Sequence, residues 1–287
     1  MRVVVTGATG NVGTSVVASL VGDPGVDEVV GLARRAPAEP LPGAEFRCAD
    51  VTDSDLASIF RGADAVAHLA WLIQPGRDES VTSRVNLLGS QRVLRAVVEA
   101  RVGALIYASS VGAYSPGPKD RLVDESWPTG GIPTSFYSRH KAAVERQLDA
   151  LQSEQPDLRV VRMRPGLIFK RAAATEIRRL FVGPLLPRAV LRSELIPVSP
   201  AVPGLRFQAV HADDVGDPYR RAVVSDAQGP FNLAADPVIG SPSWRTCSRP
   251  ARSRCRPASC APRRPRALPS GSSPRSRAGS TWRSGCP

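Results

Sequence analysis

Short apolar runs alternate with segments of helical periodicity along the first 165 residues of this chain. The apolar runs predict strands over residues 2–6, 28–33, 45–48, 65–69, 104–109 and 159–164. Helices are expected to begin near Asn11, Ser54, Asp78 and Ser135, with Thr52 or Asp53 capping the second one. Because strands and helices alternate, the pattern predicts an α/β fold with a doubly wound parallel sheet.

The pattern loosens after Pro165, where five prolines interrupt residues 166–204. Pro removes a backbone donor and stops regular elements, so we expect irregular structure in a separate small lobe there. A strand over 207–211, a helix over 213–224 and a strand over 231–234 return to the earlier pattern. We therefore expect one large domain over 1–165 that residues 205–234 rejoin, with 166–204 and 235–240 forming the small lobe.

The last 47 residues differ in composition from the rest. Residues 241–287 contain 11 Arg, 11 Ser, 8 Pro and one Leu, with no Asp, Glu or Lys. Such a segment buries too little apolar surface to offset chain entropy, so disorder is expected. It is either a basic tail for nucleic acid or acidic partners, or the product of a frameshift in a GC-rich gene. Scattered Cys and Trp and the absence of Lys favour the frameshift.

This tail also explains the net charge of +12, which by itself would suggest nucleic-acid binding. The other 240 residues hold 27 of the 38 basic residues and all 26 acidic ones. The body is therefore nearly neutral, and nucleic acid is not an expected partner. No apolar run reaches the roughly 18 residues that a membrane span needs, and no signal peptide is evident, so we expect a cytoplasmic protein without a membrane partner.

A glycine-rich turn, TGATGNVG, occupies residues 6–13 between the first predicted strand and the first helix. Gly7 permits a sharp turn, Gly10 lets backbone approach a pyrophosphate, and Gly13 allows close helix–sheet packing. Free N–H groups and the positive end of the helix then face the phosphates. The turn predicts a Rossmann-type dinucleotide site; the alternative is a tight glycine turn that binds nothing.

Tyr137 and Lys141 stand four residues apart at the start of a predicted helix, so they share one face. A phenol has a pKa of about 10, and a nearby ammonium is expected to lower that pKa toward the range useful for proton transfer. Lysine is rare here, since only Lys119, Lys141 and Lys170 occur, and this makes a chance pairing improbable. The alternative is an exposed helical pair without a catalytic role.

These features, in this order, resemble the extended short-chain dehydrogenases/reductases of the NAD(P)-dependent epimerase/dehydratase family. The resemblance covers about residues 1–240. It rests on the glycine turn and on the segments Asp50–Asp53, His68-Leu69-Ala70, Val85-Asn86, Ala108-Ser109-Ser110, Tyr137-x-x-x-Lys141, Arg164-Pro165-Gly166 and His211–Val215.

The resemblance implies that hydride moves between a substrate carbon and nicotinamide while Tyr137 exchanges the proton. Lys141 would lower the pKa of Tyr137 and hold the nicotinamide ribose, and Ser110 would orient the reacting oxygen. No metal is implied. The cofactor-binding residues that it implies are Gly7, Thr9, Gly10, Asn11, Val12, Gly13, Arg34, Asp50, Val51, Leu69, Ala70, Tyr137, Lys141 and Pro165.

The end of the second predicted strand bears on the choice of cofactor. An acidic residue there normally holds the adenosine ribose, but this chain has Ala33 followed by Arg34 and Arg35. A guanidinium suits a 2′-phosphate, so NADP is favoured over NAD. The alternative is that both arginines are solvated surface charges.

The family further implies a small-molecule substrate, commonly a nucleotide sugar, and a homodimer paired through helices near 80–101 and 136–154. This chain departs from the family at Lys170, which replaces a loop glycine, and in the tail, where the substrate lobe should continue. Two alternatives therefore stay open: an NADP-binding sensor without turnover, and an inactive truncated enzyme. Asn86 could be structural, water-holding or catalytic, while His68 and His140 are expected to be packing or loop residues.

Overall fold

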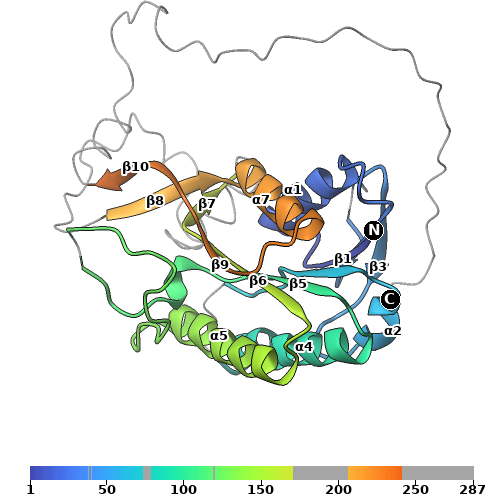
Figure 1. Ribbon diagram of the computed structural model, residues 1–287, viewed down its shortest axis with the longest axis horizontal. Helices are drawn as coiled ribbons and strands as arrows, with labels where there is room; N and C mark the ends of the chain where they lie inside the picture. Colours follow the sequence, from blue (N-terminus) through green and yellow to red (C-terminus); the bar gives the residue numbers. More distant parts are fainter. Residues whose placement is uncertain (38, 40, 74–78, 119, 171–205, 241–287) are drawn as a thin grey trace, which may run out of the picture.

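The computed structural model describes residues 1–37, 39, 41–73, 79–118, 120–170 and 206–240. Within them, seven strands form one sheet in the order β3-β2-β1-β4-β5-β6-β9, and every neighbouring pair is parallel (Figure 1). The strands are β1 (Arg2–Thr6), β2 (Glu28–Ala33), β3 (Ala44–Cys48), β4 (Ala65–His68), β5 (Ala104–Ala108), β6 (Arg159–Pro165) and β9 (Gly229–Leu233).

Helices cover both faces of this sheet (Figure 1). One face carries α1 (Asn11–Val21) and α7 (Ala212–Val224); the other carries α2 (Leu56–Phe60), α4 (Ser90–Glu99) and α5 (Phe136–Glu154). Shorter turns complete the helices: α3 (Glu79–Ser83), a π-helix η1 (Arg84–Gly89) and a 3₁₀ turn η2 (Val111–Ala113). The predicted doubly wound parallel sheet is confirmed.

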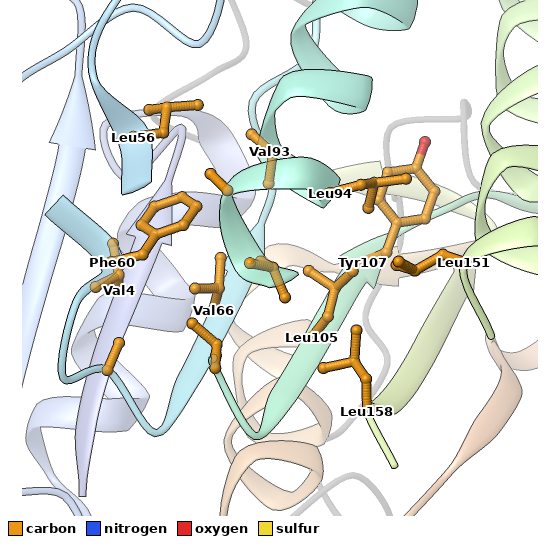
Figure 2. Packing of buried hydrophobic residues seen from close by; sticks show 14 of the residues in the cluster. Val4, Leu56, Phe60, Val66, Val93, Leu94, Leu105, Tyr107, Leu151 and Leu158 are labelled. Atoms are coloured by element: carbon orange, nitrogen blue, oxygen red, sulfur yellow. The ribbon is translucent and has the colours of Figure 1, made fainter. Parts of the chain in front are cut away.

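Two apolar layers, one on each side of the sheet, hold these elements together. On the side of α2, α4 and α5, Phe60 packs in one cluster with Val4 and Val66, and all three are fully buried (Figure 2). Complete burial of such a side chain stabilises the fold by roughly 1.5–3 kcal/mol. The central strands β1, β4 and β5 are buried on both faces, which explains why their sequences are apolar almost throughout.

A second, smaller sheet follows Pro165 in the chain. It has the order β10-β8-β7, with β7 (Leu167–Phe169) parallel and β10 (Ala235–Gly240) antiparallel to β8 (Arg206–His211). The expectation of irregular structure directly after Pro165 was therefore wrong at β7. A three-residue strand carries almost no periodicity of its own, and β7 forms because β8, some forty residues later, pairs with it.

The predicted cap of α2 was also wrong. The helix begins at Leu56, and the Asp55 carboxylate accepts a hydrogen bond from the Ser58 N–H at 3.2 Å. Thr52 instead donates to Asp50 in the preceding turn. The helix starts two residues later than expected, and this moves the cap to the next carboxylate.

The tail over 241–287, with its predicted disorder and frameshift, lies outside the described residues, as do residues 171–204 of the predicted small lobe. In the part of the chain that is described, no helix is long and apolar enough to cross a membrane. Nor does that part bring three or more His, Cys, Asp or Glu side chains together in a metal-binding group. The cytoplasmic location stays a prediction.

Candidate functional site

The glycine turn between β1 and α1 is tightly packed. Gly7 has φ of 70°, and a Cβ placed on it would lie 2.7 Å from the backbone nitrogen of Ala70. A Cβ on Gly13 would collide with the carbonyl oxygen of Gly7, and one on Gly10 would lie 3.2 Å from the same oxygen. The turn therefore has its present shape because these positions lack side chains.

A crevice opens beside this turn, at the carboxyl ends of β1, β2 and β4. Eight of the residues predicted to bind the cofactor line it: Gly7, Thr9, Gly10, Arg34, Asp50, Val51, Leu69 and Ala70. Asn11, Val12 and Gly13 form the first turn of α1, and Pro165 is the buried last residue of β6. Sequence reasoning missed Thr6, Leu32, Trp71, Leu72 and Val85, which also line the crevice.

The start of α1 is suited to an anionic ligand. Gly10 at the N-cap offers no side-chain acceptor, and the first turn holds no acidic residue. The first N–H groups of the helix are therefore available to phosphate oxygens. The Asn11 Oδ1 atom is buried without a hydrogen-bond partner among the described residues, so a ligand hydroxyl could satisfy it. The turn, the helix end and the crevice beside them fit a dinucleotide.

A histidine forms part of the support under the crevice. His68 is buried, with its Nδ1 2.7 Å from Thr6 Oγ1 and its Nε2 3.0 Å from Ser90 Oγ. Burial, with a smaller contribution from the charge of Lys141, lowers the pKa of His68 to about 3. The imidazole is therefore neutral at physiological pH and ties β1 and β4 to α4.

An asparagine holds the crevice segment that follows β4. The fully buried Asn86 amide accepts a hydrogen bond from Leu72 N–H at 2.8 Å and donates to the Leu72 carbonyl oxygen at 3.0 Å. Its Nδ2 also lies 3.5 Å from His140 Nδ1. Among the roles considered for Asn86, these contacts support the structural one, because both ends of its amide are engaged by backbone.

Lys141 on α5 is almost completely buried. Its ammonium donates to the carbonyl oxygen of Ala108, at the end of β5, over 2.6 Å. The nitrogen also lies 3.4 Å from the ring centroid of Trp71, 5.1 Å from that of Tyr107 and 5.9 Å from that of Tyr137. Burial lowers the pKa of Lys141 well below its usual value, although the carboxylate of Glu145 acts in the opposite direction.

Tyr137 and Ser110 lie next to this lysine. Ser110 accepts a hydrogen bond from Gly112 N–H at 3.0 Å, and a Cβ on Gly112 would lie 2.9 Å from Tyr137 Cε1. The sequence predicted that the ammonium would lower the pKa of Tyr137, but here burial raises that pKa and only a hydrogen bond with Ser110 lowers it. The prediction was wrong for this state because the phenol is desolvated.

A buried ionic cluster supports α5 one turn beyond Lys141. The fully buried Glu145 carboxylate accepts hydrogen bonds from Arg164 at 2.9 and 3.0 Å, from Arg162 at 3.0 Å and from Ser109 at 2.5 Å. Sequence reasoning missed this cluster. The i, i+4 spacing of Lys141 and Glu145 places both on one face of the helix, but it does not indicate the arginine partners, which come from β6.

Lys170, which departs from the family pattern, contacts the start of α1. Its ammonium donates to Thr14 Oγ1 at 2.9 Å and Ser15 Oγ at 2.8 Å, and lies 3.4 Å from Asp213 Oδ1. Ser15 also donates to Asp213 at 2.7 Å. The substitution thus ties the end of β7 to α1 and α7.

Comparisons with known proteins identify the family of this chain. Residues 3–232 match the NAD dependent epimerase/dehydratase family. An uncharacterised protein of Mycobacterium tuberculosis is 30% identical over 238 residues, which are 82% of this chain but only 22% of that protein. The 3 beta-hydroxysteroid dehydrogenase/Delta 5-->4-isomerase of the same species is 29% identical over 258 residues, covering 83% of this chain and 68% of the enzyme.

Solved structures show the same fold. The UDP-glucose 4-epimerase of Thermus thermophilus, in complex with NAD, is 25% identical with a TM-score of 0.68 over 86% of this chain and 82% of that one. MoeE5 in complex with UDP-glucose and NAD is 26% identical with a TM-score of 0.67, over 86% of this chain and 81% of that one. The chain belongs to the NAD dependent epimerase/dehydratase family.

Proposed function

We propose that this chain is an NAD(P)-dependent oxidoreductase or epimerase that acts on a hydroxyl or keto group of a small molecule. One observation carries the proposal: Ser110, Tyr137 and Lys141 meet at the carboxyl end of β5, where the ammonium contacts the Ala108 carbonyl. In a parallel sheet this edge is where ligands bind. A sensor that only binds nucleotide has no need of this trio.

A bound nicotinamide would supply the carbon that accepts or returns hydride. Ser110 would hold the reacting oxygen of the substrate, and Tyr137 would exchange a proton with that oxygen. Because burial raises the pKa of Tyr137, its phenol is protonated at neutral pH, which suits donation to a carbonyl oxygen. Lys141 would hold the nicotinamide ribose and favour the phenolate in the reverse direction.

The cofactor that we propose is NADP. Ala33 and Arg34 line the crevice at the end of β2, so an exposed guanidinium stands where an acidic residue would hold the ribose. Replacing Arg34 with Ser should weaken NADPH binding at least tenfold and leave NADH binding within about twofold. The reason is that the guanidinium would bind only the 2′-phosphate, which NADH lacks. Fluorescence titration of both nucleotides measures this, and equal losses for the two would contradict it.

The relatives suggest two substrate classes. One solved structure is a UDP-glucose 4-epimerase, and another, MoeE5, has UDP-glucose bound. A relative by sequence is instead a hydroxysteroid dehydrogenase. Both classes present a secondary hydroxyl or the corresponding ketone. A nucleotide sugar is the first class to test, with a hydroxysteroid as the second.

The deciding experiment compares Tyr137→Phe with Tyr219→Phe. The buried Tyr219 hydroxyl has no hydrogen-bond partner among the described residues, so its loss should leave the site unchanged. Tyr137→Phe should lower turnover of NADPH-dependent reduction at least a hundredfold, within the range of general acid–base catalysis, while nucleotide affinity stays the same. Wild-type activity retained in Tyr137→Phe would refute the proposed chemistry, and nucleotide binding without turnover in the wild type would favour the sensor.

A further inference from the structure

No sequence pattern gives Trp71 a role, but its position in the structure suggests one. It follows β4 by three residues, lines the crevice and presents its ring to two of the proposed catalytic groups. Its centroid lies 3.4 Å from Lys141 Nζ, and it meets the Tyr137 ring edge-on at a centroid distance of 6.1 Å and an angle of 80°. The indole therefore contacts both the lysine and the tyrosine.

The backbone on both sides of Trp71 is fixed. Ala70 N–H donates to Thr6 Oγ1 at 3.3 Å, and the same nitrogen would lie 2.7 Å from a Cβ on Gly7. On the other side, the Asn86 amide binds both the N–H and the carbonyl of Leu72. Because neither neighbour can shift freely, the indole has a defined place over the ammonium.

The ammonium has few other partners in this place. The Ala108 carbonyl accepts one of its three N–H groups, and the face of Trp71 lies against another side of its charge. In the part of the chain that the structure describes, the titratable side chains around Lys141 are Tyr107 on β5, His68 on β4, and Tyr137 and Glu145 on α5. Of these only Glu145 is negative at neutral pH, and its carboxylate is already shared by arginines.

We propose that Trp71 is a positioning residue: its ring face holds the Lys141 ammonium against the Ala108 carbonyl and leaves one N–H for a ligand. A cation over an aromatic face is attracted by the ring's negative centre, most strongly where water is excluded. The effect on turnover rests on the proposed function, whereas the effect on Lys141 itself does not.

Lysine-specific ¹³C labelling and NMR test this directly, because the chain contains only three lysines. Lys119→Arg and Lys170→Arg variants assign the signals. In the wild type, the Lys141 ε-protons should appear upfield of the other two because they lie over an indole ring. In Trp71→Leu that shift should disappear and the pKa of Lys141 should fall by about one pH unit, since an apolar wall without a π-face remains.

Two further variants make the outcome decisive. Trp71→Phe keeps an aromatic face and should retain part of the upfield shift and of the pKa, which protects the test against misfolding of Trp71→Leu. Trp127→Phe removes a different indole, one that donates to the Ser115 carbonyl, and should leave the Lys141 signal unchanged. An unaltered Lys141 shift and pKa in Trp71→Leu would overturn the inference.

Turnover separates this inference from the proposed function. If both hold, the pH profile of kcat in Trp71→Leu should move with the pKa of Lys141, and kcat at neutral pH should fall about tenfold. A Lys141 signal that shifts in Trp71→Leu, together with no turnover in any variant, would support the role of Trp71 and reject the catalytic proposal.

Discussion

Glu145→Gln is the substitution whose effect follows most directly from the structure. The carboxylate is fully buried and pairs with both Arg164 and Arg162, which are themselves 3% and 7% exposed. Gln keeps the shape but leaves two guanidinium groups without their shared counter-charge, apart from a contact of Arg162 with the exposed Asp149. Removing one partner of a buried pair costs about 3–5 kcal/mol, because a buried charge stays uncompensated.

That cost is a large share of the roughly 5–15 kcal/mol that stabilises a typical domain. Urea unfolding followed by circular dichroism at neutral pH measures the loss as a lower midpoint. Glu154→Gln is the matched control, since Glu154 lies exposed at the end of the same helix and should change stability by less than about 0.5 kcal/mol. A loss below about 1 kcal/mol in Glu145→Gln would refute the reasoning that this cluster is electrostatically coupled.

The stabilities of the wild type and of Glu145→Gln should depend differently on pH. Burial tends to raise the pKa of Glu145, but hydrogen bonds from Arg164 and Ser109 and the nearby positive charges outweigh it and lower the pKa below 4.5. When the pKa of a carboxyl is lower in the folded state than in the unfolded state, its ionised form stabilises the fold at pH values above the unfolded-state pKa. This stabilisation is lost as the pH falls through the folded-state pKa. The difference in stability between wild type and Glu145→Gln should therefore be constant above about pH 5 and shrink at lower pH.

Three further substitutions test separate features. Gly112→Ala places a Cβ 2.9 Å from Tyr137 Cε1, so kcat should fall about tenfold with unchanged nucleotide affinity, whereas normal kcat would show that the ring yields freely. Asp55→Ala removes the cap of α2 and should cost about 1 kcal/mol in thermal or urea unfolding, and Asp53→Ala should cost less if the cap is correctly assigned. The resemblance implies a homodimer paired through helices near 80–101 and 136–154. Leu88→Glu places a charge at an apolar side chain that is 46% exposed on η1, so light scattering should show a dimer in the wild type and a monomer in the variant.

The sequence was sufficient for the parts of the fold that local pattern controls. Apolar strands such as β1 and β4 and the glycine turn before α1 follow from residues that are neighbours in the chain. The same local logic brought Tyr137 and Lys141 to one helix face. The short strand β7 was missed because its partner β8 comes much later.

Trp71 and Glu145 show why the rest of the site could not be predicted. Nothing near position 71 indicates that its ring will meet a lysine seventy residues further along. A buried carboxylate is likewise indistinguishable in sequence from a solvated one until its partners Arg162 and Arg164 are brought to it by β6. The predicted lowering of the Tyr137 pKa was wrong for a related reason, because the burial that raises this pKa is a property of the folded chain.

The late position of β9 in the chain has a consequence for synthesis. β6 ends at Pro165, and the strand that covers its edge begins only at Gly229. At a synthesis rate of roughly 5–20 residues per second, the edge of β6 remains unpaired for about 3–13 seconds before β9 is synthesised. An uncovered strand edge is a template for pairing with other chains. Slow synthesis between these strands, or a high concentration of nascent chains, should therefore favour aggregation of a protein whose finished sheet has this edge protected.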